Sequence, residues 1–202
     1  MTAATLSWTE RAAALTLDGR CVIEGQRRDA ADGSTFAKHS PIDARRLGSV
    51  ARGQAADIDA AVASARAAFD DGRWARRAPA ARKKVLQAFA EKILAAKDEL
   101  ALLETLDMGK PIQFSRTVDV PATARCIQWY AEAIDKVYDE IAPTGPNALA
   151  LITREAMGVI GCIVPWNYPM IMAAWKLGPA LATGNSVVLK PSEKSPYTAL
   201  RL

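Results

Sequence analysis

The stretch from Met157 to Trp175 restricts the fold more than any other part of the sequence, because its 19 residues include no charged side chain. A stretch of this length is close to the minimum for a membrane-spanning helix. Pro165, Asn167 and Pro169, however, interrupt its middle, where a lipid-exposed span would leave backbone groups unpaired and bury an amide. The sequence therefore predicts a buried strand, a sharp turn and a buried helix, and no membrane span.

The segments around this turn predict an α/β fold with a parallel sheet. We expect a strand over Met157 to Val164 and a helix over Met170 to Ala182, which Gly178-Pro179 should kink or interrupt. A second buried strand is expected over Ser186 to Lys190, and a further helix from about Ser195-Pro196. Strand, helix, strand and helix in this order open a βαβ unit. Because a doubly wound sheet needs more strands than this, the sequence is expected to be truncated.

The residues before this unit predict short strands followed by four helices. The strands are expected at 21–25, 35–40 and 47–51, and the helices at 57–72, from about 79, at 98–109 and at 112–138, where Pro121 either kinks the helix or starts its main part. We therefore divide the chain into the amino-terminal strands and helices (1–145), an extended arm expected to serve oligomerisation (146–156), and the βαβ unit (157–202).

The composition is that of an ordinary globular protein, with 50% hydrophobic and 24% charged residues. A net charge of +4 over 202 residues is a weak basic bias. Basic pairs such as Arg27-Arg28 and Arg76-Arg77 are dispersed, so the sequence does not predict a surface for nucleic acid.

The cysteines exclude two kinds of site. Cys21, Cys126 and Cys162 are far apart and odd in number, and His39 is the only histidine. Neither a disulfide framework nor a CxxC metal site is available, so we expect no metal centre and a reducing, cytoplasmic setting. The first residues, Met1 to Arg11, show no signal-peptide pattern.

The candidate site lies after the two buried strands, since ligands bind beyond the carboxyl ends of strands in open α/β sheets. Ile163 to Asn167 follow the first strand and bring an aromatic ring and an amide; Lys190 to Glu193 follow the second and bring a cation, a hydroxyl and a carboxylate. Together they could hold a nucleotide, although neither GxGxxG nor a Walker A sequence is present. The alternative is structural: Trp166 packs in the core, Asn167 caps the helix, and the charged residues are only solvated.

The order and spacing of several blocks resemble the aldehyde dehydrogenase superfamily. The blocks are Gly158 to Gly161, Pro165 to Pro169, Trp175 to Ala182, Gly184 to Ser186 and Leu189 to Glu193, with Leu103 to Pro111 and Trp129 to Glu132 upstream. The resemblance covers nearly the whole chain, but only the amino-terminal part of a family member. Trp129 to Tyr138 and Lys190 to Pro196 resemble most the γ-glutamyl-γ-aminobutyraldehyde dehydrogenases of putrescine breakdown.

This resemblance implies an incomplete Rossmann-like cofactor-binding domain and the NAD-dependent oxidation of an aldehyde to an acid, with NADP as the alternative cofactor. Asn167 matches the amide that helps hold the oxyanion, and Lys190 and Glu193 match residues that contact the adenosine ribose. Neighbouring cofactor positions match Ile163, Val164, Pro165, Trp166 and Ser192. Positions lining the aldehyde channel match Tyr168, Met172 and Trp175, whose spacing also suits plain core packing.

The resemblance also places the family's nucleophilic cysteine and general-base glutamate after Leu202. Cys162, inside the expected strand, is predicted to be buried packing and not the nucleophile. Two functions therefore remain open: the front part of a homo-oligomeric aldehyde dehydrogenase, or a truncated, non-catalytic chain that acts at most as a binding or interaction module.

Overall fold

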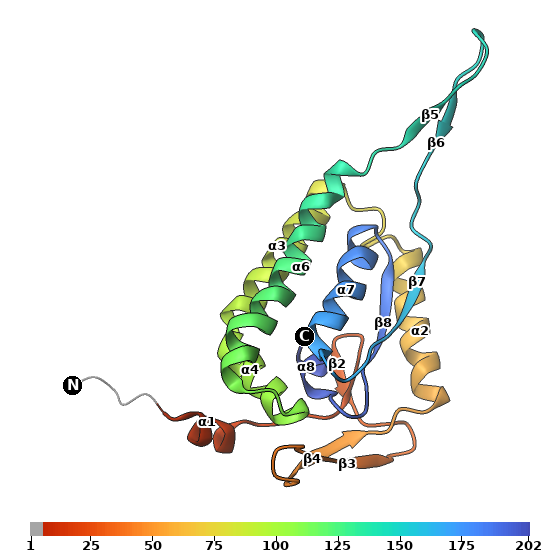
Figure 1. The fold of residues 1–202 in the computed structure, drawn as a ribbon. Coiled ribbons are helices and arrows are strands. Elements are labelled where there is room, and N and C mark those ends of the chain that lie inside the picture. The colour runs from red at the N-terminus through yellow and green to blue at the C-terminus, as the bar shows by residue number, and fades with distance from the viewer. Residues whose placement is uncertain (1–5) are drawn as a thin grey trace.

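The computed structural model describes residues 6–202, in which a layer of helices packs against a βαβ unit and a thin arm projects away from both (Figure 1). The first element of the described residues is α1 (Trp8–Ala14), although the first 55 residues predicted only strands. The carboxylate of Glu10 accepts from the backbone N–H of Ser7 at 2.7 Å, and the Ser7 hydroxyl accepts from the N–H of Glu10 at 3.3 Å. The spacing of Ser7 and Glu10 in this capping box can be recognised in the sequence. The sequence shows no apolar helix face, because α1 buries no residue.

Short antiparallel pairs follow α1. The strand β1 (Cys21–Ile23) pairs with β2 (Gln26–Arg28), and β3 (Thr35–His39) pairs with β4 (Arg46–Ala51). The expected strands near residues 21, 35 and 47 are therefore confirmed, and β2 is an addition to them.

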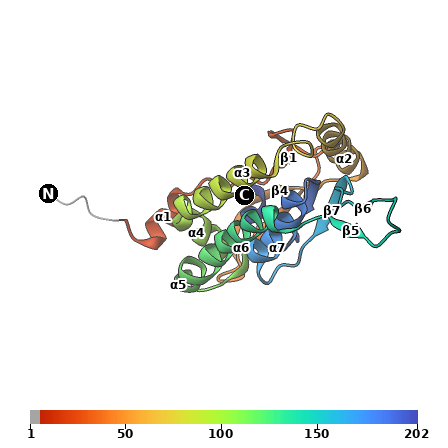
Figure 2. The ribbon, with the colours of Figure 1, turned by 90° about the horizontal axis from the view of Figure 1, so that it is seen from above.

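The helical layer consists of α3 (Pro79–Ala95), α4 (Lys97–Met108) and α6 (Val120–Ala133), with α2 (Ala55–Asp70) standing apart from it. Figure 2 shows α3, α6 and α7 side by side. Asp57 lies inside the first turn of α2, where its carboxylate accepts from the N–H of Gln54 at 2.8 Å. The helices α3, α4, α6 and α7 share a core that includes Leu86, Ile93, Leu100, Val120, Ile127 and Met170.

The fourth expected helix is divided into several pieces. It comprises α5 (Ile112–Phe114), a π-helical turn η1 (Ser115–Asp119), α6, and a 3-10 turn η2 (Ile134–Lys136). Pro121 stands in the first turn of α6, so it starts the main part of the helix rather than kinking it.

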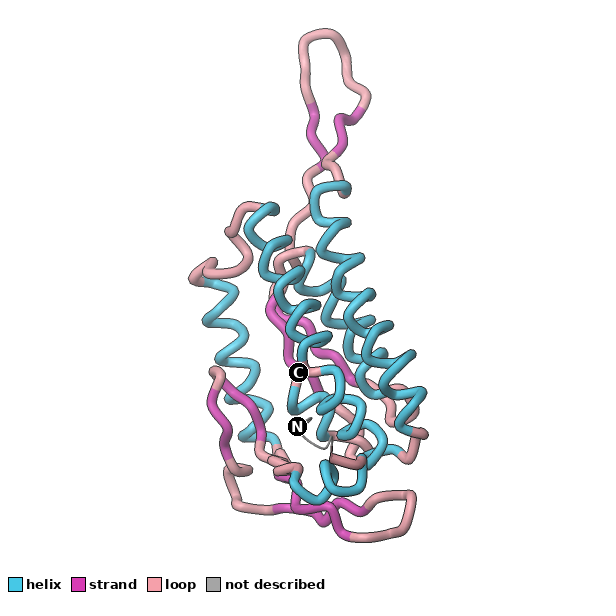
Figure 3. The backbone as a smooth tube through the Cα atoms, turned by 90° about the vertical axis from the view of Figure 1, so that its left-hand side faces the viewer, coloured by secondary structure: helices cyan, strands magenta, loops and turns pink. Residues whose placement is uncertain are grey.

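The arm is a hairpin of β5 (Glu140–Ala142) and β6 (Ala150–Ile152), and it stands clear of the helices in Figure 1 and Figure 3. The extended residues expected after residue 146 supply β6, whereas β5 lies before that expected boundary. Its apolar side chains are exposed; Ile141 is 71% and Leu151 62% accessible.

The βαβ unit consists of β7 (Val159–Ile163), α7 (Pro169–Ala182) and β8 (Ser186–Lys190), followed by α8 (Tyr197–Arg201). The strands are parallel, with Val159 opposite Ser186 and Ile163 opposite Lys190. Helix α7 lies on one side of this pair and α2 on the other (Figure 1). The predicted α/β class is thus confirmed. The expected interruption at Gly178-Pro179 is not: α7 continues to Ala182. No helix within residues 6–202 is long and apolar enough to cross a membrane.

Candidate cofactor and active site

The loops that follow β7 and β8 lie next to each other at the carboxyl edge of the parallel pair. The N–H of Val164 donates to the carbonyl of Lys190 at 3.2 Å, which extends the strand pairing by one step. The hydroxyl of Ser195 donates to the carbonyl of Trp166 at 3.1 Å, and Ser195 is fully buried. The structure therefore brings together the two groups of residues that the sequence placed after the two strands.

Lys190 and Glu193 form an exposed pair on the second loop. The Lys190 ammonium lies 3.6 Å from the Glu193 carboxylate, with the side chains 52% and 63% accessible. The pKa of Glu193 is lowered by its own backbone N–H and by the nearby Lys190 and Lys194. This loop therefore presents a carboxylate that is ionised at neutral pH beside a cation.

Ser192 takes a different position from its neighbours. It is buried, and its hydroxyl accepts from the N–H of Lys194 at 3.2 Å. In this structure its side chain shapes the turn between β8 and α8.

Asn167 and Trp166 occupy the turn between β7 and α7. Both are exposed, Trp166 by 49%. The alternative roles considered from the sequence, a core position for Trp166 and a helix cap for Asn167, are not found: no side chain caps the amino end of α7. The Lys194 ammonium lies 5.9 Å from the centroid of the Trp166 ring.

Tyr168, Met172 and Trp175 follow on α7 and at its start. Tyr168 is 45% and Trp175 56% exposed, and Met172 is half-buried. Plain core packing therefore does not explain Tyr168 or Trp175. The remaining positions of the first loop differ: Ile163 is 77% exposed and Pro165 is also exposed, whereas the Val164 side chain is buried, so Val164 can meet a ligand only through its backbone.

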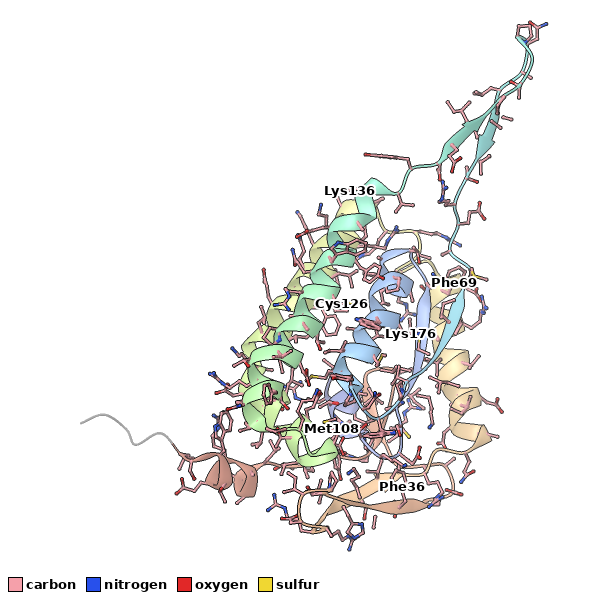
Figure 4. The ribbon with its side chains drawn as sticks, in the orientation of Figure 1. Phe36, Phe69, Met108, Cys126, Lys136 and Lys176 are labelled. Atoms are coloured by element: carbon pink, nitrogen blue, oxygen red, sulfur yellow. The ribbon has the colours of Figure 1, made fainter. Side chains whose placement is uncertain are left out.

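The cysteines offer no activated thiol near these loops. Cys162 lies in β7 and is 4% exposed, as expected of buried packing, and burial raises the pKa of its thiol. Cys126 lies on α6, across α7 from the strand pair (Figure 4), and burial raises its pKa as well. Within the described part of the chain, no group of three or more His, Cys, Asp or Glu side chains is arranged to hold a metal ion.

A set of buried ionisable side chains behind the turn was not predicted from the sequence. Glu104 and Asp107 on α4, and Asp119 at the end of η1, are at most 1% exposed. Asp107 accepts from the N–H of Tyr197 at 2.7 Å and lies 3.2 Å from the ammonium of the buried Lys38. Two carboxylates spaced three residues apart in an apolar helix were a signal that could have been noticed.

Comparison with known proteins accounts for these features together. Residues 28–202 match the profile of the aldehyde dehydrogenase family. The chain is 52% identical, over 195 residues, to the NADP/NAD-dependent aldehyde dehydrogenase PuuC of Escherichia coli strain K12, covering 96% of this chain and 39% of PuuC. It is 50% identical to the aminoacetaldehyde dehydrogenase of Pseudomonas aeruginosa, covering 95% of this chain and 38% of that protein.

Solved structures agree with the sequence comparison. A γ-glutamyl-γ-aminobutyraldehyde dehydrogenase from Burkholderia cenocepacia J2315 superposes with a TM-score of 0.94 at 57% identity, covering 96% of this chain and 39% of that one. An indole-3-acetaldehyde dehydrogenase from P. syringae, in complex with NAD+, gives 0.95 at 57% identity with the same coverage. The chain thus spans about two fifths of the length of these relatives. On this similarity of sequence and structure, the chain belongs to the aldehyde dehydrogenase family.

Proposed function

We propose that the chain supplies the cofactor-binding loops and the oxyanion-holding amide of an NAD(P)-dependent aldehyde dehydrogenase. The observation that carries the proposal is the exposed, uncapped turn at Asn167, held against the Lys190–Glu193 loop by the hydrogen bond from Ser195 to Trp166. This arrangement supports an active site more than a simple binding module, because an exposed amide and an exposed carboxylate lie on the two loops at one edge of the sheet.

The residues fit the adenosine end of a dinucleotide. The Glu193 carboxylate is exposed and can accept from both hydroxyls of a ribose, as the acidic residue does in other dinucleotide-binding folds. Lys190 adds a donor on the same sugar. When bound, NAD supplies the hydride acceptor for the oxidation. Ile163, Pro165 and Trp166 form the exposed wall beside it, with Val164 and Ser192 contributing backbone groups.

Asn167 acts where negative charge develops. Nucleophilic attack on the aldehyde carbon turns the carbonyl oxygen into an oxyanion, and the Asn167 amide donates a hydrogen bond to it without a titratable proton. Such preorganised donors typically account for ~10²–10³ in rate. Tyr168, Met172 and Trp175 are proposed to line the approach of the aldehyde: Met172 and Trp175 are three residues apart on α7 and so lie on one side of it, and Tyr168 directly precedes the helix, next to Asn167.

The names of the relatives support a proposal on the substrate class, and the exposed arm supports one on assembly. PuuC, an aminoacetaldehyde dehydrogenase and a γ-glutamyl-γ-aminobutyraldehyde dehydrogenase are among them, so we propose an aminoaldehyde or its γ-glutamyl conjugate as substrate. The exposed apolar hairpin β5–β6 is proposed to pair with a second copy of the protein, because an isolated hairpin with exposed Ile141 and Leu151 gains stability only when covered.

The test uses a full-length enzyme that carries this chain, with NADH formation followed by absorbance. We expect Asn167→Ala to lower kcat by about 10²-fold or more and to leave the Kd of NAD within about twofold. Gln113→Ala, which removes an exposed amide on α5, is the matched control. If kcat of the Asn167 variant stays within about twofold of the parent, the oxyanion role is wrong.

A further inference from the structure

A buried chain of polar groups connects the helical layer to the turn at Asn167. Glu104 on α4 is 0% exposed and Asp119 at the end of η1 is 1% exposed. Asp119 pairs with the ammonium of Lys110, which is itself largely buried. That ammonium lies 3.9 Å from the centroid of the Tyr168 ring, and Tyr168 directly follows Asn167 in the sequence. This series of polar side chains therefore runs from the core to the exposed turn at Asn167, which the proposed function uses.

The buried carboxyl group of Glu104 needs a proton in order to form a hydrogen bond at this position. Both of its carboxyl oxygens are buried without a hydrogen-bond partner among residues 6–202. An ionised carboxylate only accepts hydrogen bonds, and so does the Asp119 carboxylate beside it. A proton on Glu104 supplies the missing donor and leaves the negative charge on Asp119, where it faces Lys110.

The charges around Glu104 agree with this assignment. Burial, followed by the neighbouring Asp119, raises the pKa of Glu104 to about 9, and Lys110 and the backbone N–H of Met170 lower it only in part. Glu104 is therefore neutral at pH 7. The N–H of Met170 belongs to the first turn of α7, which has no side-chain cap, so Glu104 also lies against the start of the helix that follows Asn167.

Local structure explains how these groups meet. Gly109 ends α4 with a φ of 83°, a left-handed conformation that suits glycine and turns the chain so that Lys110 points back toward η1. The π-helical turn inserts one extra residue before α6 and ends at Asp119. The hydroxyl of Thr123 then donates to the carbonyl of Asp119 at 2.8 Å and holds this turn in place.

We propose that Glu104, Asp119 and Lys110 form a positioning chain that fixes the Tyr168 ring and, through it, the orientation of Asn167. The inference rests on the proposed function, because the position of the turn matters to catalysis only if Asn167 holds the oxyanion. Lys110 is a positioning residue: it contacts Tyr168 and not the reacting atoms. A displacement of about 1 Å at such a turn is enough to lower a rate by up to ~10²-fold.

The first experiment replaces the cation in the full-length enzyme. Lys110→Met keeps an apolar stem and removes the charge that Asp119 and Tyr168 share. We expect kcat to fall about tenfold, a loss within the range for misplaced groups, with the KM for NAD within about twofold, because Lys190 and Glu193 lie on the other loop. Lys110→Arg, which keeps a cation over the ring, is expected to recover most of kcat.

The matched control is Lys83→Met, which breaks the 2.7 Å pair between Lys83 and Asp135 near the opposite end of α6. It is expected to leave both constants unchanged. An unchanged kcat in Lys110→Met, or a KM for NAD that rises as much as kcat falls, would overturn the positioning role.

The second experiment tests the proton without any substrate. The infrared spectrum at pH 7 is expected to contain a protonated-carboxyl band that disappears in Glu104→Gln and weakens in the unmodified enzyme as the pH rises through about 9. Glu91→Gln, an exposed glutamate on α3, is the control and should keep the band. A spectrum at pH 7 that Glu104→Gln leaves unchanged would show that Glu104 is ionised and overturn the inference, whatever the enzyme's turnover.

Discussion

The ring of Tyr130 on α6 occupies the space where a side chain at Gly178 on α7 would begin: a Cβ built there would lie 2.5 Å from a ring carbon. The contact lets the two helices approach closely and sets the distance between the helical layer and the βαβ unit. It also explains why Gly178 stands in the middle of a helix where glycine is usually unfavourable.

We therefore expect Gly178→Ala to destabilise the protein by about 1–3 kcal/mol, the usual cost of inserting a methyl group into a packed contact. Urea unfolding would measure this loss. Gly145→Ala, at a glycine in the arm with open space around it, is the control. Equal stability of the two variants would mean that Tyr130 yields at no cost and that the contact does not set the helix spacing.

Asp107 makes the stability depend on pH. Burial raises its pKa from 3.8 to about 6, although Lys38 and the N–H of Tyr197 oppose the shift. Between these two pKa values Asp107 is protonated to a larger extent in the folded state than in the unfolded state. The free energy of unfolding therefore falls as the pH rises from about 4 to about 6, and it levels off above that. Below pH 4 both states are protonated and Asp107 contributes no slope.

We expect Asp107→Asn to remove this part of the pH dependence, measured by denaturant unfolding at pH 4, 5, 6 and 7. The variant should also be less stable than the parent at pH 7, because the buried Lys38 loses its charged partner. Asp43→Asn, in an exposed pair with Arg45, is the control, since loss of an exposed charge changes the free energy of unfolding little. If the free energy of unfolding of Asp107→Asn still falls over this pH range, groups other than Asp107 cause the pH dependence.

Glu193 is expected to select the cofactor. A carboxylate that accepts from the ribose hydroxyls repels the 2′-phosphate of NADP, while Lys190, 3.6 Å away, attracts it. Because we propose that the carboxylate accepts from these hydroxyls, we expect kcat/KM in the full-length enzyme to favour NAD. Glu193→Gln should shift the ratio toward NADP by about tenfold, or ~1.4 kcal/mol. Equal values for both cofactors in the parent enzyme would contradict the assignment.

The sequence predicted the elements whose signals are local. The bounds of β8 agree with the expected Ser186 to Lys190, and Gly109 and Pro121 mark the helix end and start that their chemistry favours. The adjacency of the two loops followed from the rule that parallel strands end at one edge.

The parts that were missed depend on contacts between distant residues. Glu104 and Asp119 are 15 positions apart in sequence, and only the packing of α4 against η1 reveals that their carboxyl groups share a buried space. The π-helical turn has no sequence signature of its own. The expected helix end at Ala182 is confirmed, whereas the uninterrupted course of α7 through Gly178-Pro179 was not predictable, because the packing of Gly178 on Tyr130 outweighs the local tendency of Gly-Pro to interrupt a helix.

The last prediction concerns the 202-residue chain by itself: we expect it not to oxidise aldehydes with either cofactor. The proposed oxyanion donor and ribose-binding groups are present, but burial raises the thiol pKa of Cys21, Cys126 and Cys162 alike, and a thiol with a raised pKa is a poor nucleophile. Cys162 is in addition 4% exposed and held within β7.

The measurement is NADH absorbance with purified chain, whose folding is first checked by circular dichroism, and with several aldehydes including an aminoaldehyde. No signal above a blank is the expected result. Turnover that Cys162→Ser abolishes would show that the buried thiol becomes accessible and acts as the nucleophile. Turnover that survives this substitution would place the reactive group elsewhere in the chain, with Cys21→Ser and Cys126→Ser as the next variants, because these two residues are only partly buried.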